Sequence, residues 1–169
     1  MTNESLTVVL LGFVGLGREL LSYLMATRIL QPLANSISIR RYLDDQVATG
    51  KLAVPPIRYL GPVREYRAQA AERFLIAVGK PADRSRLWSS QINRGAQPFT
   101  CIHPSAIVAR DAKIPPGCIV VPNTVVNAGA TLEENCIINV MSSVGHAARV
   151  GRHSVHPPYN VVNGLAALG

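Results

Sequence analysis

A repeating hydrophobic pattern runs through the second half of the chain. From residue 102 onward a hydrophobic position recurs every six residues, and eleven of the twelve residues at these positions are aliphatic. They are Ile102, Val108, Ile114, Val120, Val126, Leu132, Ile138, Val144, Val150, His156, Val162 and Leu168. Four places after each stands a small or nearly small residue: Ala106, Ala112, Cys118, Thr124, Ala130, Cys136, Ser142, Ala148, Ser154, Asn160 and Ala166. Since a period of six fits neither a helix nor an ordinary strand, the pattern predicts repeated short structural units.

One aliphatic and one small residue in every six predict a short flat strand followed by a tight corner. Three such six-residue faces close a triangular coil, and each coil buries its hydrophobic side chains only against the next coil. The corners must turn sharply, and the chain offers Pro115-Pro116-Gly117, Asn123, Asn127, Gly129, Gly145 and Gly151 for this purpose. Cys118 and Cys136 are separated by one full coil, and we interpret them as stacked small core residues rather than a redox pair.

The first hundred residues instead alternate between strand and helix patterns. Strands are predicted over Leu6–Leu11, Ser36–Leu43, Ile57–Leu60 and Phe74–Gly79. Helices are predicted after the glycine turn Gly12–Gly17 with Leu20, Leu21 and Leu24 as an apolar stripe, over Val63–Ala71, and from Pro81 through about Arg94. The alternation predicts a small parallel sheet with helices on its faces. We therefore expect two domains, covering residues 1–100 and 101–169.

Three groups of residues lie where a parallel sheet binds ligands, outside the carboxyl ends of its strands. They are the loop with Gly12, Gly15 and Gly17, the pair Asp44 and Asp45, and Gly79 with Lys80. The glycine spacing is G-x-x-G-x-G, which differs from the dinucleotide fingerprint G-x-G-x-x-G. The loop therefore indicates either a phosphate bound at the start of the helix or only a tight turn between strand and helix.

Composition narrows the classes of function. Hydrophobic residues make up 48% of the chain, which excludes a disordered polar tail, and no apolar run approaches the roughly 18 residues of a membrane span. The first residues lack a basic region ahead of Leu6–Leu11, so we expect a cytoplasmic protein. Residues 1–100 hold 13 Lys/Arg against 7 Asp/Glu, but the basic residues are scattered, which argues against a nucleic-acid partner. Cys101, Cys118 and Cys136 are too few and too spread for a disulfide framework or a CxxC metal site.

Several segments, read together, resemble one family. They are the glycine loop, Tyr42-Leu43-Asp44-Asp45, Tyr59-Leu60-Gly61-Pro62, Ile76-Ala77-Val78-Gly79 with Arg84 downstream, Ile102-His103-Pro104-Ser105-Ala106, and Asn139-Val140-Met141-Ser142-Ser143-Val144-Gly145-His146. The hexapeptide repeat resembles the left-handed β-helix acyltransferases. The whole chain resembles their sialic-acid O-acetyltransferase and UDP-4-amino-sugar N-acetyltransferase (NeuD-type) branch. This resemblance implies a small Rossmann-like domain followed by a left-handed parallel β-helix, which here is shortened to fewer than four coils.

The resemblance also implies an activity. Members of the family transfer an acetyl group from acetyl-CoA to an amino group or hydroxyl of a nucleotide-linked sugar in surface glycan biosynthesis, and they assemble as homotrimers. The family's catalytic histidine corresponds to His146, which would act as general base, and Asn139 would lie close to the same pocket. Histidine suits this task because its pKa lies near neutral pH. The resemblance assigns the sugar or nucleotide end to the first domain, His156 to acetyl-CoA, and no metal to the site.

The chain also departs from the family pattern. Ala147 stands where the family has an acidic residue after the catalytic histidine, Val155 stands where it has a second histidine, and Val14, Gly15 and Leu16 replace a histidine-containing loop. Two alternatives therefore stay open. One is a shortened, non-catalytic member that binds a sugar nucleotide or only oligomerises. The other is a zinc enzyme of the γ-carbonic-anhydrase type, for which His146, His153 and His156 are the only closely spaced histidines.

Overall fold

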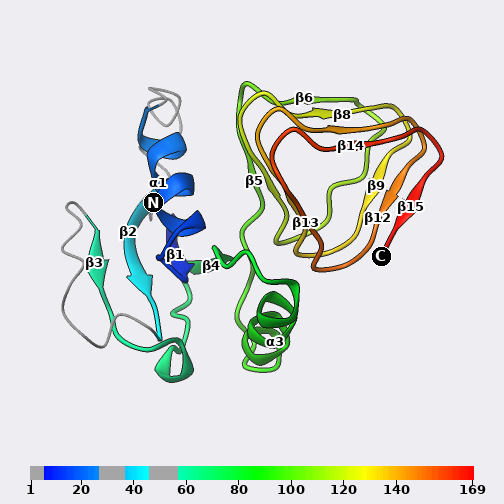
Figure 1. Ribbon diagram of the computed structural model, residues 1–169. Coiled ribbons are helices and arrows are strands. Elements are labelled where there is room, and N and C mark those ends of the chain that lie inside the picture. Colours follow the sequence, from blue (N-terminus) through cyan, green and yellow to red (C-terminus); the bar gives the residue numbers. More distant parts are fainter. Residues whose placement is uncertain (1–5, 27–36, 46–56) are drawn as a thin grey trace, which may run out of the picture. The chain divides into compact units, whose positions relative to one another are not determined.

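The computed structural model describes residues 6–26, 37–45 and 57–169 (Figure 1). The chain divides into two compact units. The first, the sheet unit, comprises Met1–Gly79 and Arg86–Phe99. The second, the β-helix unit, comprises Lys80–Ser85 and Thr100–Gly169. In the part of the chain that is described, no helix is both long enough and apolar enough to cross a membrane.

The sheet unit is built on four parallel strands in the order β3-β2-β1-β4. They are β1 (Leu6–Leu11), β2 (Ile37–Leu43), β3 (Arg58–Tyr59) and β4 (Glu72–Ile76). Residues 8–11 of β1 are completely buried because this strand is central, which explains its continuous apolar run. Helix α1 (Leu16–Ala26) follows β1 directly, as predicted, and the predicted residue Ser36 lies outside the described residues.

A cluster of hydrophobic side chains forms part of the core of the sheet unit. It combines side chains from the strands with others that follow them in the chain: Val9, Leu11, Leu43, Val63, Tyr66, Phe74, Ile76, Leu87, Trp88 and Ala96. The rings of Phe74 and Trp88 meet edge to face, with their centroids 5.8 Å apart. Trp88 belongs to helix α3 (Pro81–Ile92), which ends two residues before the predicted end. Burial of these side chains is the main favourable term for this unit.

The helix predicted over Val63–Ala71 is wrong. Only a 3-10 turn, η1 (Val63–Glu65), forms there, because Tyr66 leaves the turn with extended backbone at φ −64° and ψ 132°. That conformation takes the Tyr66 ring into the core, where its hydroxyl donates to Glu72 Oε2 at 3.1 Å. A tertiary contact thus overrides the helix propensity of the segment.

The β-helix unit consists of two-residue strands that form three parallel sheets, as the period of six predicted. Sheet B contains β5 (Cys101–Ile102), β7 (Ile119–Val120), β10 (Ile137–Ile138) and β13 (Val155–His156). Sheet C contains β6 (Ile107–Val108), β8 (Val125–Val126), β11 (Ser143–Val144) and β14 (Val161–Val162). Sheet D contains β9 (Thr131–Leu132), β12 (Arg149–Val150) and β15 (Ala167–Leu168). Paired residues are one coil apart, such as Val126 and Val144, and the three sheets form the sides of the triangle in Figure 1.

Both predicted registers point inward. The core of this unit holds aliphatic residues of the first register, such as Leu132 and Ile138, together with Cys118, Ala130, Cys136 and Ala148 of the second. The exceptions lie in the terminal coils, where Ile102 and Leu168 are 44% and 46% exposed. The two cysteines are free thiols inside this core, which is the role expected from their spacing.

The corners have a regular backbone conformation. Every sixth residue from 117 to 165 has a positive φ: Gly117, Asn123, Gly129, Asn135, Met141, Ala147, His153, Tyr159 and Leu165. The first four are glycine or asparagine, which tolerate this left-handed region well. The last five have side chains that disfavour it, so the later corners hold strained residues.

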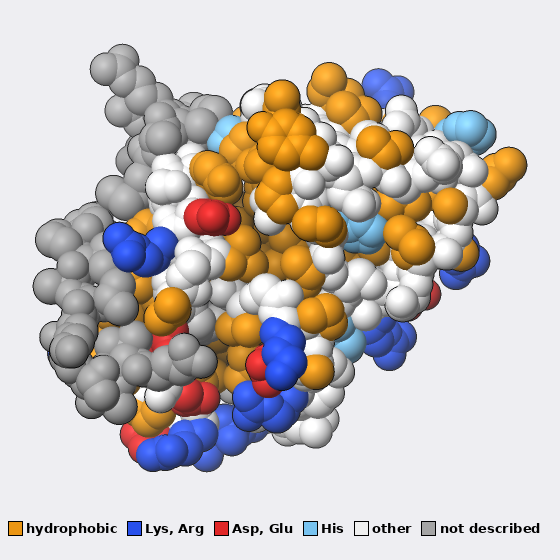
Figure 2. Space-filling view, viewed as in Figure 1, with side chains coloured by type: hydrophobic (Ala, Val, Ile, Leu, Met, Phe, Trp, Pro, Cys, Tyr) orange, Lys and Arg blue, Asp and Glu red, His pale blue; other side chains and the backbone are white. Residues whose placement is uncertain are grey.

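The strand residue before each core position points outward, and the three sheets differ in what they present there. Sheet D presents Lys113, Thr131, Arg149 and Ala167, and is mostly polar. Sheet C presents Ile107, Val125, Ser143 and Val161, of which Ile107 and Val161 are 67% and 64% exposed. Hydrophobic side chains gather along the border of the molecule where β6, β8 and β14 lie (Figures 1 and 2). Sheet C is therefore the exposed apolar face of the β-helix.

Candidate functional site

His146 lies at the corner between sheets C and D. Strand β11 ends at Val144, β12 begins at Arg149, and Gly145, His146 and Ala147 make the turn between them. The backbone there is well fixed, because Gly145 N–H donates to Val162 O at 2.7 Å and Leu165 N–H donates to His146 O at 2.9 Å. The imidazole is exposed, and none of the described side chains forms a hydrogen bond with it. The corner thus presents a free imidazole beside the exposed apolar face.

Asn139 lies at a different corner from His146. It follows β10, at the junction of sheets B and C, and strand β11 separates the two residues. Its side chain is buried, and Asn139 Oδ1 accepts the N–H of Val140 at 2.8 Å. A single chain therefore does not bring Asn139 and His146 together, although both corners border the apolar face of sheet C.

His156 keeps the inward register that the period of six gave it. It pairs with Ile138 in sheet B, is only 6% exposed, and has Nδ1 within 3.1 Å of Asn160 Oδ1. Pro157 and Pro158 do not turn it outward. Because so little of the ring reaches the surface, direct contact between His156 and a bound molecule would need the last coils to move.

The three closely spaced histidines do not converge. His146 and His153 stand at different corners, and His156 lies inside the coil. Among the described residues, no group of three His, Cys, Asp or Glu side chains is arranged to hold a metal ion. The geometry of this chain gives the zinc alternative no support.

The glycine loop after β1 is shaped by close packing. A Cβ on Gly12 would lie 2.5 Å from Val78 Cγ2, and one on Gly17 would lie 2.6 Å from the carbonyl oxygen of Gly12. These two glycines are therefore required for the loop to fit against the end of β4. Gly15 and Gly79, in contrast, have open space where a side chain would stand, and Gly15 has φ +68°. Lys80 follows Gly79, is exposed, and belongs to the β-helix unit.

The two predicted acidic residues hold loops in place. Asp44 is 6% exposed, and its Oδ2 accepts the N–H groups of Phe13 and Val14 at 2.7 and 3.3 Å. Asp45 Oδ1 accepts the N–H of Val63 at 2.8 Å, but the residue itself is exposed. The structure thus brings Asp44 to the glycine loop, as predicted, and gives both carboxylates a structural contact that the sequence did not reveal.

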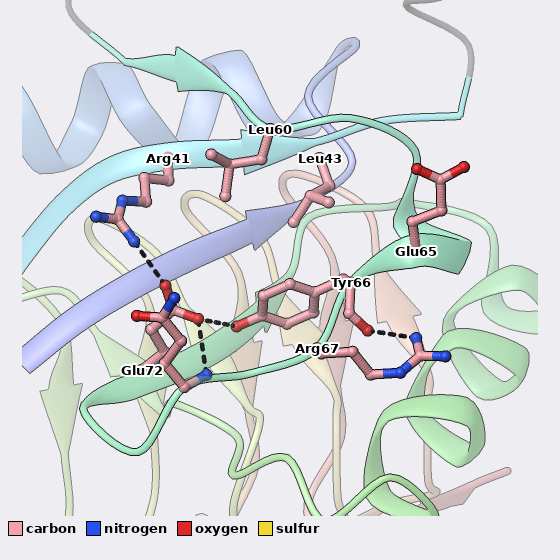
Figure 3. Close-up of a pocket in the computed structure, with 8 residues that line it drawn as sticks. Arg41, Leu43, Leu60, Glu65, Tyr66, Arg67 and Glu72 are labelled. Atoms are coloured by element: carbon pink, nitrogen blue, oxygen red, sulfur yellow. Dashed lines mark hydrogen bonds and ion pairs between the residues drawn. The ribbon is translucent and has the colours of Figure 1, made fainter.

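A cavity of about 260 Å³ lies elsewhere in the sheet unit, beside β2 and η1 (Figure 3). Its polar wall is centred on Glu72, which is 4% exposed and bonds Arg41 Nη1 at 2.8 Å, the Tyr66 hydroxyl at 3.1 Å and the Gln69 N–H at 3.0 Å. Burial, and then the charge of Glu72, raise the pKa of Tyr66, so the phenol stays protonated and donates. The hydrogen bonds among these groups occupy both carboxylate oxygens of Glu72, so we interpret the network as structural.

Sequence reasoning missed this network. Arg41 and Glu72 belong to the two strands that flank β1, and only the register of the sheet brings them together. The available signal was the presence of charged residues of opposite sign in two strands of the sheet, Arg41 in β2 and Glu72 at the start of β4, because charged residues are usually paired when buried.

A second unpredicted network fixes the start of α3 within the β-helix unit. Arg84 is completely buried, and its guanidinium donates to the backbone oxygen of Asn135 at 2.7 and 3.1 Å and to the Asn135 side-chain oxygen. Burial lowers the pKa of Arg84 to about 10. Asn135 Nδ2 lies 3.0 Å from His153 Nδ1, so the amide donates and this ring nitrogen is unprotonated. Burial, followed by the charges of Arg152 and Arg84, lowers the pKa of His153.

No protein-family model matches the chain, but solved structures resemble it closely. A mutant of perosamine N-acetyltransferase from Caulobacter crescentus, in complex with CoA and GDP-perosamine, matches with a TM-score of 0.79 and 22% identity over 95% of this chain and 73% of that one. The acetyltransferase domain of PglB from Neisseria gonorrhoeae FA1090 matches with a TM-score of 0.75 and 19% identity over 96% and 88%. WeeI from Acinetobacter baumannii AYE matches with a TM-score of 0.78 and 17% identity over 95% and 74%.

These likenesses show the fold of the chain. The repeated short parallel strands fit a left-handed β-helix, and the perosamine and PglB structures that share this architecture are acetyltransferases. They are of the kind that the sequence resemblance named, which confirms the β-helix expected from the hexapeptide repeat.

Proposed function

We propose that this chain transfers an acetyl group from acetyl-CoA to the amino group of a nucleotide-linked sugar, with His146 as general base. The observation that carries the proposal is the exposed imidazole of His146 at a corner of a three-sided β-helix, next to an apolar face. The comparisons support the chemistry, because the perosamine N-acetyltransferase structure contains CoA and GDP-perosamine and a PglB structure contains acetyl coenzyme A.

The reaction needs one proton to be moved. The amine nitrogen attacks the thioester carbonyl carbon while an imidazole nitrogen of His146 accepts the proton that the amine loses. The tetrahedral intermediate then expels the CoA sulfur, which takes the proton from the imidazolium, and leaves an N-acetylated sugar and free CoA. The imidazole of His146 is exposed, so both substrates can reach it from the side that faces the solvent.

The nucleotide end is proposed to bind the sheet unit at the glycine loop. Gly15 and Gly79 support this, because both border open space at the carboxyl ends of β1 and β4. Asp44 would act indirectly by holding the loop, whereas the exposed Asp45 could also bond a ribose or sugar hydroxyl.

We also propose that three copies assemble through the exposed face of sheet C. Its outward residues Ile107, Val125 and Val161 are apolar, and Met141 and Tyr159 at the adjoining corner are 52% and 73% exposed. Large exposed apolar patches are typical of interaction surfaces. Such an assembly would place the Asn139 corner of one copy beside the His146 corner of another.

Release of free CoA thiol tests the activity. Purified protein is incubated with acetyl-CoA and a panel of nucleotide-linked amino sugars, and the product is identified by mass. His146→Ala should abolish transfer, whereas His153→Ala, which removes a histidine from another corner, should retain it. If the wild-type chain never releases CoA with any acceptor, the non-catalytic alternative is correct. Transfer only to sugars that lack an amino group would change the acceptor to a hydroxyl.

Sedimentation tests the assembly. Val161→Lys places a charge on the proposed interface and should shift the protein from three copies toward one. The matched control is Thr131→Lys, which adds the same charge at an outward position on polar sheet D and should leave three copies together. Equal behaviour of the two variants would argue against sheet C as the interface.

Calorimetry tests the nucleotide site. Asp45→Ala should weaken binding of a nucleotide-linked sugar while circular dichroism stays unchanged. Asp111→Ala is the control, because Asp111 Oδ2 also accepts a loop N–H, that of Gly129 at 3.1 Å, but in the β-helix unit. Unchanged nucleotide binding by the Asp45 variant would remove Asp45 from the site.

A further inference from the structure

Gly164 lies directly against the imidazole of His146. It occupies the same corner as His146, one coil further along the chain. A Cβ placed on Gly164 would come within 2.6 Å of His146 Nδ1 and 2.8 Å of Nε2, and closer still to the carbon between them. Real Cβ atoms do not make such contacts. The edge of the ring that carries both nitrogens therefore rests on the bare backbone of Gly164.

The reason for glycine here is space rather than backbone conformation. Neither Gly145 nor Gly164 is among the residues with positive φ, and the left-handed position of this corner falls on Ala147 and Leu165. The residues that share this corner position in successive coils are Arg110, Ala128, His146 and Gly164. Glycine appears in the coil that receives the histidine ring.

Gly145 brings the two coils close together. A Cβ on Gly145 would lie 2.6 Å from the carbonyl carbon of Asn163 and 2.8 Å from Gly164 Cα. The N–H of Leu165 also donates to His146 O at 2.9 Å, which fixes the backbone of the histidine over the next coil. Together these contacts hold the backbone of His146 close against the next coil, where the edge of its ring lies on Gly164.

Packing is what orients this imidazole. Histidines used as general bases are commonly oriented by a hydrogen bond to the second ring nitrogen. No described side chain supplies such a bond to His146, and Ala147 is the next residue. We propose that Gly164 is a positioning residue for His146, whose missing side chain sets the direction of the catalytic imidazole. This inference rests on the proposed acetyl transfer.

Gly164→Ala tests the inference by adding one methyl group. The methyl would occupy the space of the ring edge and turn the imidazole away, so kcat should fall about 100-fold, the size of effect known for a small misplacement of a catalytic group. The KM for acetyl-CoA should change little. The Cε1–H signal of His146 in a histidine-labelled NMR spectrum should shift.

Gly151→Ala is the matched control. Its Cβ would be crowded by Gly169 Cα at 2.7 Å and Leu168 O at 2.9 Å, and its φ is also ordinary, but it lies at another corner. We expect this variant to lose stability while keeping the His146 signal and the kcat of the folded protein. Normal kcat and an unshifted His146 signal in Gly164→Ala would overturn the inference.

A measurement on the wild-type chain needs no variant to fold. A nuclear Overhauser effect is expected between a Gly164 Hα and His146 Hε1, and its absence would overturn the inference whatever the variants do. If this effect is present and the Gly164→Ala signal shifts, but the wild-type chain never transfers acetyl groups, then the ring placement holds and the proposed function fails. If transfer depends on His146 but not on Gly164, the function holds and the positioning role fails.

Discussion

The β-helix unit and the sheet unit differ in how the position of a residue in the sequence determines its environment. In the β-helix, the role of a residue follows from its place in the coil, so Val126, Val144 and Val162 have one environment in successive coils. In the sheet unit, a residue such as Glu72 gains its role from groups on other strands and loops, namely Arg41, Tyr66 and the N–H of Gln69. In the repetitive fold, a residue that departs from the pattern can be recognised in the sequence. In the mixed fold, the role of such a residue becomes clear only from its contacts in the structure.

The candidate sites show the same contrast. In the β-helix, His146 and Gly164 occupy the same corner position in successive coils, and a Cβ on Gly164 would clash with the imidazole of His146. In the sheet unit, Asp44 and Asp45 lie where a ligand site was expected, yet both carboxylates accept loop N–H groups. The carboxylates at the sheet edge thus have a structural contact, whereas none of the described side chains bonds the imidazole of His146.

The largest effect expected concerns the core of the β-helix. Ile138 and Ile102 occupy the same inward position, but Ile138 is completely buried and Ile102 is 44% exposed. Ile138→Ala should lower the free energy of unfolding by about 2–5 kcal/mol, because it leaves a cavity between coils. Ile102→Ala should lower the free energy of unfolding by less than about 1 kcal/mol, because this side chain is already largely in contact with water. Chemical denaturation measures both, and equal losses would show that the position within a coil does not determine stability.

In the sheet unit, one substitution is expected to increase stability rather than reduce it. Gln91 on α3 is 1% exposed, and neither polar atom of its side chain has a hydrogen-bond partner within the described ranges. Gln91→Leu should raise the free energy of unfolding by about 1–3 kcal/mol, because an unsatisfied buried amide carries a penalty of this size. Gln97→Leu, at an exposed position, is the control and should bring no gain. A loss of stability in the Gln91 variant would show that a partner satisfies this amide.

The strained corners give a smaller effect. Ala147 has φ +53°, a left-handed conformation that costs a residue with a side chain about 1–2 kcal/mol. Glycine adopts this conformation freely but makes the unfolded chain more flexible, which offsets part of the gain. Ala147→Gly should therefore raise the free energy of unfolding by about 0.5–1 kcal/mol. Ala128 is exposed at the same corner one coil earlier, but it occupies the position of His146 rather than that of Ala147 and has no positive φ. Ala128→Gly should therefore destabilise by a similar amount, as calorimetric melting would show. The same sign for both variants would contradict the strain.

The smallest effect is a pH dependence. The pKa of His153 is lowered from its ordinary value of 6.5, mainly by burial, so the unfolded chain binds the proton more tightly than the folded chain. Stability should be complete above pH 6.5 and should fall as the pH drops through 6.5 toward the lowered value. Protonation also breaks the bond that His153 Nδ1 accepts from Asn135. His153→Gln should flatten this slope in denaturation curves between about pH 7 and 5, and an unchanged slope in this variant would contradict the prediction.

The sequence predicted the β-helix well because its core depends only on local repetition. The period of six located the inward aliphatic residues. His156 is buried in the same register, although the family resemblance assigned it to acetyl-CoA. The strands of the sheet unit were also found, since apolar runs mark them. The helix over Val63–Ala71 was wrong because the Tyr66 ring turns into the core and bonds Glu72, a contact that the hydrophobic pattern does not reveal. For the same reason the sequence could not show that Arg84 meets Asn135, which lies far along the chain in the β-helix.

In each of the three sheets, the outward strand residues of successive coils form a column, and the residues of one column are one coil apart in the sequence. Removing or adding the residues of exactly one coil would leave sheets B, C and D with the same chemical character. A change of six residues would preserve every buried aliphatic, yet it would rotate all later columns by one side. After a deletion of six earlier residues, Arg149 would lie on the apolar side that sheet C forms, and after a deletion or an insertion His146 would leave its corner. Insertions or deletions of one six-residue face therefore preserve the hydrophobic core. Only insertions or deletions of a whole coil also preserve the chemical character of each outer face.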